Sequence, residues 1–151
     1  MNTSNATADT VHPARPISVL CVDDNRHLAE ALRIAFEHAG FVWRGWLPGA
    51  EVLAATVRKE GPAVVILDID MPGRSPFDAL EELVEVCPDC RAVVFSGHVR
   101  HDLIDRAFAA GAWGYVSKSD GEVALMQAVR EVCRNEIATS PEVRYAYEKG
   151  A

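Results

Sequence analysis

Hydrophobic residues in this chain form short continuous runs that alternate with longer segments in which they recur every three or four positions. The short runs predict buried strands, and the longer segments predict helices with one buried side. The predicted strands cover residues 17–22, 41–47, 63–67, 91–95 and 114–117, and the predicted helices cover 26–39, 50–60, 77–86, 99–110 and 122–135. Strands that are apolar on both faces indicate a parallel sheet covered by helices on each side.

Residues at the helix ends support this alternation. Asn25 is a favourable N-cap for the first helix, and Gly40 is typical of the position after a helix end. The buried side of the last helix is expected to consist of Val123, Met126, Val129 and Cys133. Each helix therefore follows a strand directly, as in a doubly wound α/β sheet.

The repeat and the chain length predict one domain whose five strands lie in the order 2-1-3-4-5. The chain has 151 residues, of which 49% are hydrophobic, which is enough for one buried core. We assign residues 1–15 to a flexible N-terminal segment, 16–137 to the domain and 138–151 to a C-terminal tail. In this order the first and third strands are neighbours, so their carboxyl ends share one crevice.

Reactive side chains stand at the ends of four predicted strands. The first strand ends at Asp23 and Asp24, and the third ends at Asp68. The fourth strand ends at Ser96, and the fifth ends at Lys118. Carboxylates that share a crevice repel one another unless a proton or cation joins them, and a hard divalent cation prefers such oxygen ligands. The sequence therefore predicts a metal site at this edge of the sheet.

Charge and hydropathy exclude several functions. The net charge of −7, from 22 acidic and 15 basic residues, disfavours direct nucleic-acid binding by this chain. No apolar stretch reaches the length of a membrane span, and the first sixteen residues lack the apolar core of a signal peptide. We therefore expect a cytoplasmic protein that does not associate with membranes.

Cys87 and Cys90 have the two-residue spacing of redox and zinc motifs. A structural zinc site needs two further ligands at a similar spacing, and the sequence has no second pair. The pair also follows a predicted helix, whereas a redox pair precedes one. We interpret this spacing as chance.

The segments at the strand ends resemble the receiver domain of two-component response regulators. The strongest resemblance lies in residues 19–24 (VLCVDD), 65–73 (VILDIDMPG) and 111–118 (GAWGYVSK), within a match that extends from 17 to 137. The resemblance implies a flavodoxin-like α/β fold with five parallel strands and five helices. The last segment is most similar to receivers that precede a helix-turn-helix output domain. The chain is then either a natural stand-alone receiver or part of a longer regulator.

By this resemblance, Asp68 is the phosphoacceptor, which takes a phosphoryl group from a sensor histidine kinase or a phosphotransfer protein. Asp23, Asp24 and Asp68 would bind Mg²⁺, and the backbone carbonyl of Asp70 would complete the protein ligands. Mg²⁺ offsets the charge that develops as the phosphoryl group moves.

The resemblance also assigns the switch. Lys118 and the Ser96 hydroxyl would bind oxygens of the phosphoryl group. Tyr115 resembles the aromatic residue that rotates inward behind Ser96, which changes a face that binds a partner or a second copy of the chain. This phosphorylation-dependent switch would carry phosphorelay signal transduction.

Two features of the site region differ from the family pattern or vary within it. Pro76 stands where the family usually has glycine, which stiffens the loop after Asp68. Asp70 and His98 follow Asp68 and Ser96 by two positions each, where side chains tend to control the access of water in receivers.

Two other functions fit parts of the pattern. A Mg²⁺-dependent phosphatase with an aspartyl nucleophile would use Asp70 as its acid and base, two positions after Asp68. A phosphate-independent interaction module would use none of these groups. The combination of residues favours the switch, which is not an enzyme with catalytic turnover.

Overall fold

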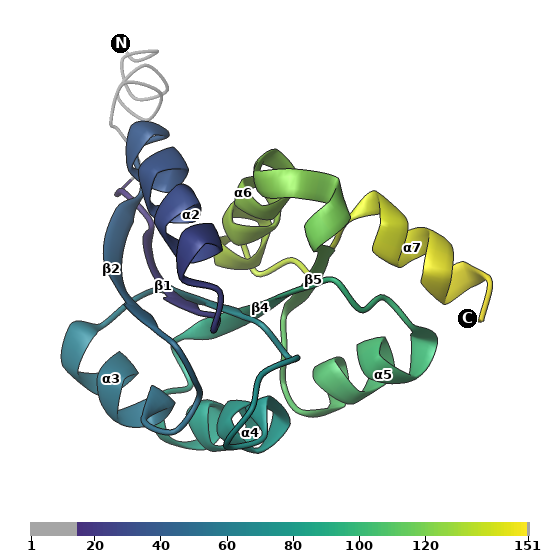
Figure 1. Cartoon of the computed structure of the whole chain (residues 1–151), viewed down its shortest axis with the longest axis horizontal. Coiled ribbons are helices and arrows are strands. Elements are labelled where there is room, and N and C mark those ends of the chain that lie inside the picture. The colour runs from purple at the N-terminus through teal and green to yellow at the C-terminus, as the bar shows by residue number, and fades with distance from the viewer. Residues whose placement is uncertain (1–14, 151) are drawn as a thin grey trace, which may run out of the picture.

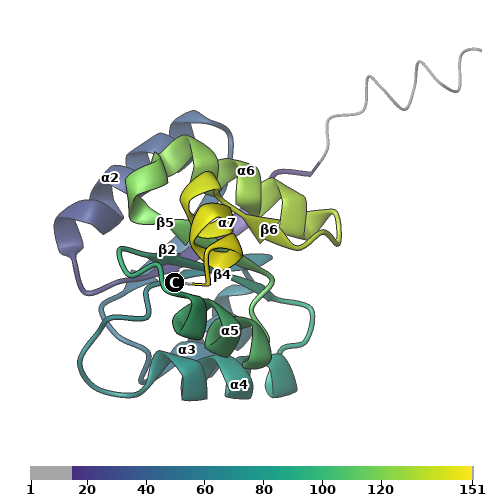
Figure 2. The same ribbon diagram turned by 90° about the vertical axis from the view of Figure 1, so that its right-hand side faces the viewer.

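The computed structural model describes residues 15–150, so all but the last residue of the predicted N-terminal segment lies outside the described part. Figures 1 and 2 show one sheet between two layers of helices. The strands are β1 (Ser18–Val22), β2 (Val42–Leu47), β3 (Val64–Leu67), β4 (Arg91–Ser96), β5 (Gly114–Ser117) and β6 (Ala138–Thr139). The helices are α2 (Arg26–His38), α3 (Leu53–Glu60), α4 (Pro76–Val86), α5 (His101–Ala109), α6 (Gly121–Cys133), α7 (Pro141–Glu148) and the 3₁₀ turn η1 (Lys118–Asp120).

The sheet has the order β2-β1-β3-β4-β5-β6, and all of its strand pairs are parallel. The predicted order of the first five strands is therefore confirmed, and a short sixth strand extends the sheet beyond the prediction. Because β1 and β3 are adjacent, Asp23 and Asp68 leave the sheet side by side, and the Asp68 amide donates to the Val22 carbonyl at 2.9 Å.

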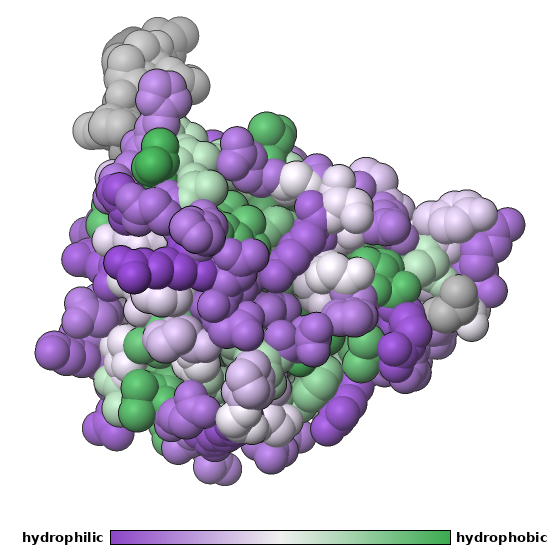
Figure 3. Space-filling model, viewed as in Figure 1, coloured by the Kyte–Doolittle hydropathy of each residue, from purple (hydrophilic) through white to green (hydrophobic). Residues whose placement is uncertain are grey.

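Alternate residues of each strand enter two separate cores. Val65 and Leu67 of β3 pack on the side of α3, α4 and α5, whereas Val64 and Ile66 pack on the side of α2 and α6. All four are at most 1% exposed. Burial on both faces explains why these strands are continuous apolar runs rather than alternating ones. The face shown in Figure 3 is mostly hydrophilic, with hydrophobic side chains in small patches.

Helix starts follow their capping residues. The Asn25 side chain accepts from the Leu28 amide at 3.0 Å, as its predicted capping role requires. The helix predicted over 50–60 begins only at Leu53, and the residue before it makes no side-chain capping bond. Without a capping side chain, residues 50–52 remain in a turn.

The predicted buried side of the last helix is partly wrong. Val123 is 76% exposed and Cys133 is also exposed, whereas Leu125, Val129 and Val132 are fully buried. The buried face of α6 is therefore centred on the row through Leu125, Val129 and Val132. This helix has more apolar residues than the sheet can cover, so their periodicity alone does not show which row of residues is buried.

The segment predicted as a C-terminal tail forms β6 and α7. Ala138 and Thr139 pair with β5, and Pro141 then occupies the first turn of α7. Val143 is fully buried and Ala146 is 9% exposed. Ser140 followed by Pro141 is a typical helix start, and the apolar Val143 and Ala146 lie three positions apart. The sequence therefore contained a signal for this helix.

The Cys87–Cys90 segment forms a turn in which the Cys90 amide donates to the Cys87 carbonyl at 3.0 Å. Burial raises the pKa of the Cys90 thiol to about 12, so the thiol stays protonated at neutral pH. This environment supports a packing role for Cys90.

Within residues 15–150, no helix combines the length and the apolar character that a membrane span requires.

Candidate functional site

The carboxyl ends of the parallel strands bring the predicted site residues to one edge of the sheet. Asp23 follows β1 and is 2% exposed, and Asp68 follows β3 and is 4% exposed. Ser96 is the last residue of β4 and is fully buried, and Lys118 follows β5 directly. Two buried carboxylates therefore face a lysine that remains partly exposed to solvent.

The three predicted metal ligands that follow β1 and β3 lie together. Asp23, Asp24 and Asp68 each offer an oxygen, and these oxygens lie within 4.8 Å of one another. The Lys118 ammonium lies 2.9 Å from Asp23 Oδ2 and 3.5 Å from Asp68 Oδ2. Three carboxylates and one ammonium leave two negative charges uncompensated. A hard divalent cation matches both this charge and the oxygen donors.

Each buried carboxylate is fixed through both of its oxygens. Asp23 Oδ1 accepts from the Asn25 amide at 2.8 Å, while its Oδ2 faces Lys118. Asp68 Oδ1 accepts from the Asp70 amide at 3.2 Å, while its Oδ2 also faces Lys118. The backbone therefore sets the direction of both carboxylates before any ligand arrives, which is the preorganisation that electrostatic catalysis needs.

Burial and neighbouring charges shift two pKa values in this cluster. Burial raises the pKa of Asp68 above its ordinary value, although Lys118 and the Asp70 amide oppose the shift. Burial disfavours the charged Lys118, but the Asp23 and Asp68 carboxylates outweigh it and raise the pKa of the ammonium. The cluster thus holds a firmly protonated lysine beside a carboxylate that is costly to ionise.

Trp46 supports the site in a way that sequence analysis did not predict. Its Nε1 donates to the Asp23 carbonyl at 2.6 Å. The register between β1 and β2 shifts after Val19, and Gly45 in the shifted stretch has a φ of +141°. This bulge sets the direction of Trp46. The only signal in the sequence was a glycine inside a strand pattern.

The loops after β3 and β4 meet above the site. The Ser96 hydroxyl oxygen accepts from the His98 amide at 2.9 Å. His98 Nε2 lies 2.8 Å from Asp70 Oδ2, so these two exposed side chains form a pair between the loops. The Asp70 carboxylate is therefore engaged by His98, and the role of its backbone carbonyl as a metal ligand remains a prediction.

Tyr115, the predicted switch residue, lies in the interior next to the loop after β4. Its side chain is fully buried, and its hydroxyl donates to the His98 carbonyl at 2.6 Å. Burial raises the pKa of the Tyr115 hydroxyl to about 12. The hydroxyl bond to the loop after β4 satisfies the polar end of the buried ring. Rotation of this ring on phosphorylation remains a prediction.

Comparison with known proteins decides the family. A family model described as "Response regulator receiver domain" matches residues 19–130. This chain belongs to the receiver domain family.

Two relatives show how this receiver relates to longer regulators. Response regulator GacA of Pseudomonas aeruginosa is 30% identical over 128 residues, which cover 84% of this chain and 60% of GacA. Transcriptional activator protein ExaE of Pseudomonas putida is 37% identical over 76 residues, which cover 50% of this chain and 36% of ExaE. The receiver therefore spans less than two thirds of the length of either relative.

A solved structure supports the same assignment. The crystal structure of a two-component response regulator of the LuxR family from Aurantimonas sp. SI85-9A1 superimposes with a TM-score of 0.84 at 25% identity. The match covers 89% of this receiver and 96% of that chain. The predicted resemblance to the receivers of transcriptional regulators is therefore confirmed.

The loop after β3 shows how this receiver accommodates Pro76. Pro76 begins α4, and the Ser75 side chain caps that helix. Glu51 also holds the loop, because its Oε2 accepts from the Arg74 amide at 3.1 Å. Gly73, with a φ of +92°, leaves room for this carboxylate, since an added Cβ would lie 2.0 Å from it. Sequence analysis did not predict this contact, because the two loops are distant in sequence.

The raised pKa of Asp68 predicts how stability depends on pH without metal. A raised folded-state pKa favours the folded protein below the ordinary aspartate pKa of about 3.9, and this contribution is lost as pH rises through the folded-state value. Asp68→Asn removes the ionisation. Its free energy of unfolding in urea with EDTA should exceed the wild-type value at pH 7, and the difference should shrink as pH falls toward 4.

Asp89→Asn is the matched control, because Asp89 is exposed in the turn before β4. It should leave the pH dependence of the wild type unchanged. A lower stability of Asp68→Asn at pH 7 would show that Lys118 outweighs burial, which would contradict the account of the cluster.

Proposed function

We propose that Asp68 accepts a phosphoryl group from the phosphohistidine of a sensor histidine kinase or a phosphotransfer protein. A carboxylate oxygen of Asp68 forms the new bond to phosphorus as the bond between phosphorus and the histidine nitrogen breaks. The observation that carries the proposal is the gathering of three carboxylate oxygens within 4.8 Å of one another, with the Lys118 ammonium 3.5 Å from Asp68.

The residues fit a Mg²⁺ ion as cofactor. Asp23, Asp24 and Asp68 would hold it together with the Asp70 carbonyl, and the donors are all oxygens. When bound, the ion supplies positive charge beside the oxygens of the transferring phosphoryl group. The backbone amides of Asn25 and Asp70, which donate to Asp23 and Asp68, keep these carboxylates in place while the charge on the site changes.

Lys118 and Ser96 supply the remaining contacts. The Lys118 ammonium, already directed at Asp68, moves a short distance to bind an oxygen of the new phosphoryl group. The Ser96 hydroxyl donates a hydrogen bond to another oxygen of the phosphoryl group, which draws the loop after β4 toward the site. The pKa of Lys118 is raised, so the lysine stays charged throughout.

The output is a change in the surface formed by α5, β5 and α6, read by a partner or a second copy of the chain. ExaE is a transcriptional activator by name, and we propose that this receiver also serves transcription control. It does so in the cytoplasm and through another domain or partner rather than by contacting DNA, because its net charge is −7.

Incubation with acetyl phosphate tests the acceptor. With Mg²⁺, the intact mass of the wild type should increase by one phosphoryl group, and EDTA should prevent the increase. Asp68→Asn should take up no phosphate, because the amide is not a nucleophile. Asp78→Asn, a change of the same kind at an exposed residue of α4, should be labelled like the wild type.

The same experiment separates the alternatives. Continuous release of phosphate without a stable adduct would indicate a phosphatase with Asp70 as acid and base. The absence of both label and turnover would indicate a phosphate-independent module. Full labelling of Asp68→Asn would place the acceptor elsewhere.

The His98–Asp70 pair sets how long the phosphoryl group lasts. The pair connects the two loops beside Asp68 and restricts the approach of water. Asp70→Ala opens this approach, so phosphate loss should accelerate by roughly three- to tenfold, which corresponds to about 1 kcal/mol of barrier. The rate at which the intact mass returns to that of the unphosphorylated protein measures this phosphate loss.

Asp102→Ala provides the control, because Asp102 also forms an exposed pair, with Arg100, outside the carboxylate cluster. Its phosphate should be lost at the wild-type rate. If Asp70→Ala also keeps the wild-type rate, the pair does not control water access.

A further inference from the structure

Helix α7 lies against the edge of the sheet beside β5 and α5 (Figure 2). Its inner side is apolar, because Val143 is fully buried and Ala146 is 9% exposed. A groove of about 460 Å³ remains between α7 and α5, with Ile104 and Phe108 of α5 in its wall. The helix therefore covers part of the surface through which the receiver is proposed to signal.

The first turn of α7 is attached to the end of β5 and to η1 by three hydrogen bonds, of which the one between Ser117 and Ser140 is buried. The Ser140 hydroxyl accepts from the Ser117 amide at 2.9 Å, and the Ser117 hydroxyl bonds the Glu142 carboxylate. The Glu142 amide also donates to Asp120 Oδ2 at 3.0 Å. Ser117 directly precedes Lys118, so this end of α7 is fixed to the strand that positions the lysine of the site.

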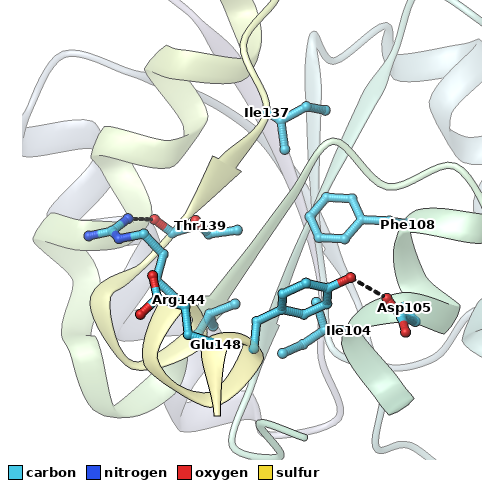
Figure 4. Close-up of a pocket in the computed structure, with 9 residues that line it drawn as sticks. Ile104, Asp105, Phe108, Ile137, Thr139, Arg144 and Glu148 are labelled. Carbon is cyan, nitrogen blue, oxygen red and sulfur yellow. Dashed lines mark hydrogen bonds between the residues drawn. The ribbon is translucent and has the colours of Figure 1, made fainter. Parts of the chain in front are cut away.

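The last turn of α7 is attached to α5 by a lighter, exposed contact. The Tyr147 hydroxyl donates to Asp105 Oδ1 at 2.8 Å, and the dashed line that ends at the labelled Asp105 in Figure 4 marks this bond. The Tyr147 ring stacks on His101, with centroids 4.1 Å apart and planes 12° apart. Tyr147 is 45% exposed, so little apolar burial supports this contact. The two ends of α7 therefore differ in strength, and the Tyr147 end is the weaker.

The loop between β4 and α5, residues 97–100, links this weak contact to the site. At the start of the loop, the His98 amide donates to Ser96 and the His98 carbonyl accepts from Tyr115. At its end, α5 begins with His101, the residue stacked on Tyr147. A movement of Ser96 toward a phosphoryl group therefore pulls on the first residue of α5.

We propose that α7 is a strap whose Tyr147 end is released from α5 when the 97–100 loop closes on the phosphoryl group, while its Ser140–Glu142 end stays attached. This regulation rests on the proposed function of Asp68. Release uncovers the Ile104 side of the groove. The strap thereby converts a small shift at Ser96 into a larger one at the C-terminal end.

Hydrogen–deuterium exchange on the whole chain tests the strap, with the intact mass of each sample reporting phosphorylation of Asp68. After acetyl phosphate and Mg²⁺, backbone amides 144–149 of the wild type should exchange about fivefold faster, because one ring stack and one hydrogen bond are lost. Tyr147→Ala should show the faster exchange without phosphate, and phosphorylation should add no further increase.

Tyr145→Ala is the matched control on the same helix, because Tyr145 is 64% exposed and its ring contacts Lys149. It should respond to phosphorylation like the wild type. Unchanged exchange in fully phosphorylated wild type would overturn the strap and leave the proposed function standing. If Asp68 takes up no phosphate, the proposed function fails and the strap fails with it.

Discussion

The crowding of carboxylates around one lysine is the constraint on which the site depends. Asp23 and Asp68 are buried because parallel strands deliver them to one crevice, and Lys118 compensates only part of their charge. Such an arrangement is costly without a ligand, as the raised pKa of Asp68 indicates. The proposed divalent cation would relieve this cost, because its positive charge offsets the carboxylates.

In the receiver fold, short chain segments and hydrogen bonds join the charged site to loops and helices on the surface. Ser96 ends β4 and precedes the loop before α5, and Lys118 follows β5 and starts the turn η1. The Tyr115 hydroxyl is hydrogen-bonded to the loop before α5, and the Ser117 hydroxyl is hydrogen-bonded to Glu142 of α7. The central strands β1, β3, β4 and β5 are packed on both faces, so a shift at their ends is expected to be transmitted to the loops and helices rather than absorbed in the core.

The sequence was sufficient for the order of the first five strands and for the gathering of Asp23, Asp24 and Asp68, because both follow from continuous apolar runs that end in charged residues. The sequence did not predict the contact between Glu51 and Arg74, because it joins loops that are distant in the chain. It also did not predict the direction of the Trp46 side chain, which depends on a β-bulge. A two-residue strand such as β6 has no periodicity to detect, although the start of α7 carried a recognisable signal.

Calorimetric titration with Mg²⁺ tests the central claim most directly. The wild type should bind one Mg²⁺, and Asp24→Asn should weaken the affinity by about tenfold or more, because it removes a metal ligand that does not bond Lys118. The exposed Asp89→Asn should match the wild type. Equal affinity in Asp24→Asn and the wild type, or the absence of saturable binding, would contradict the account.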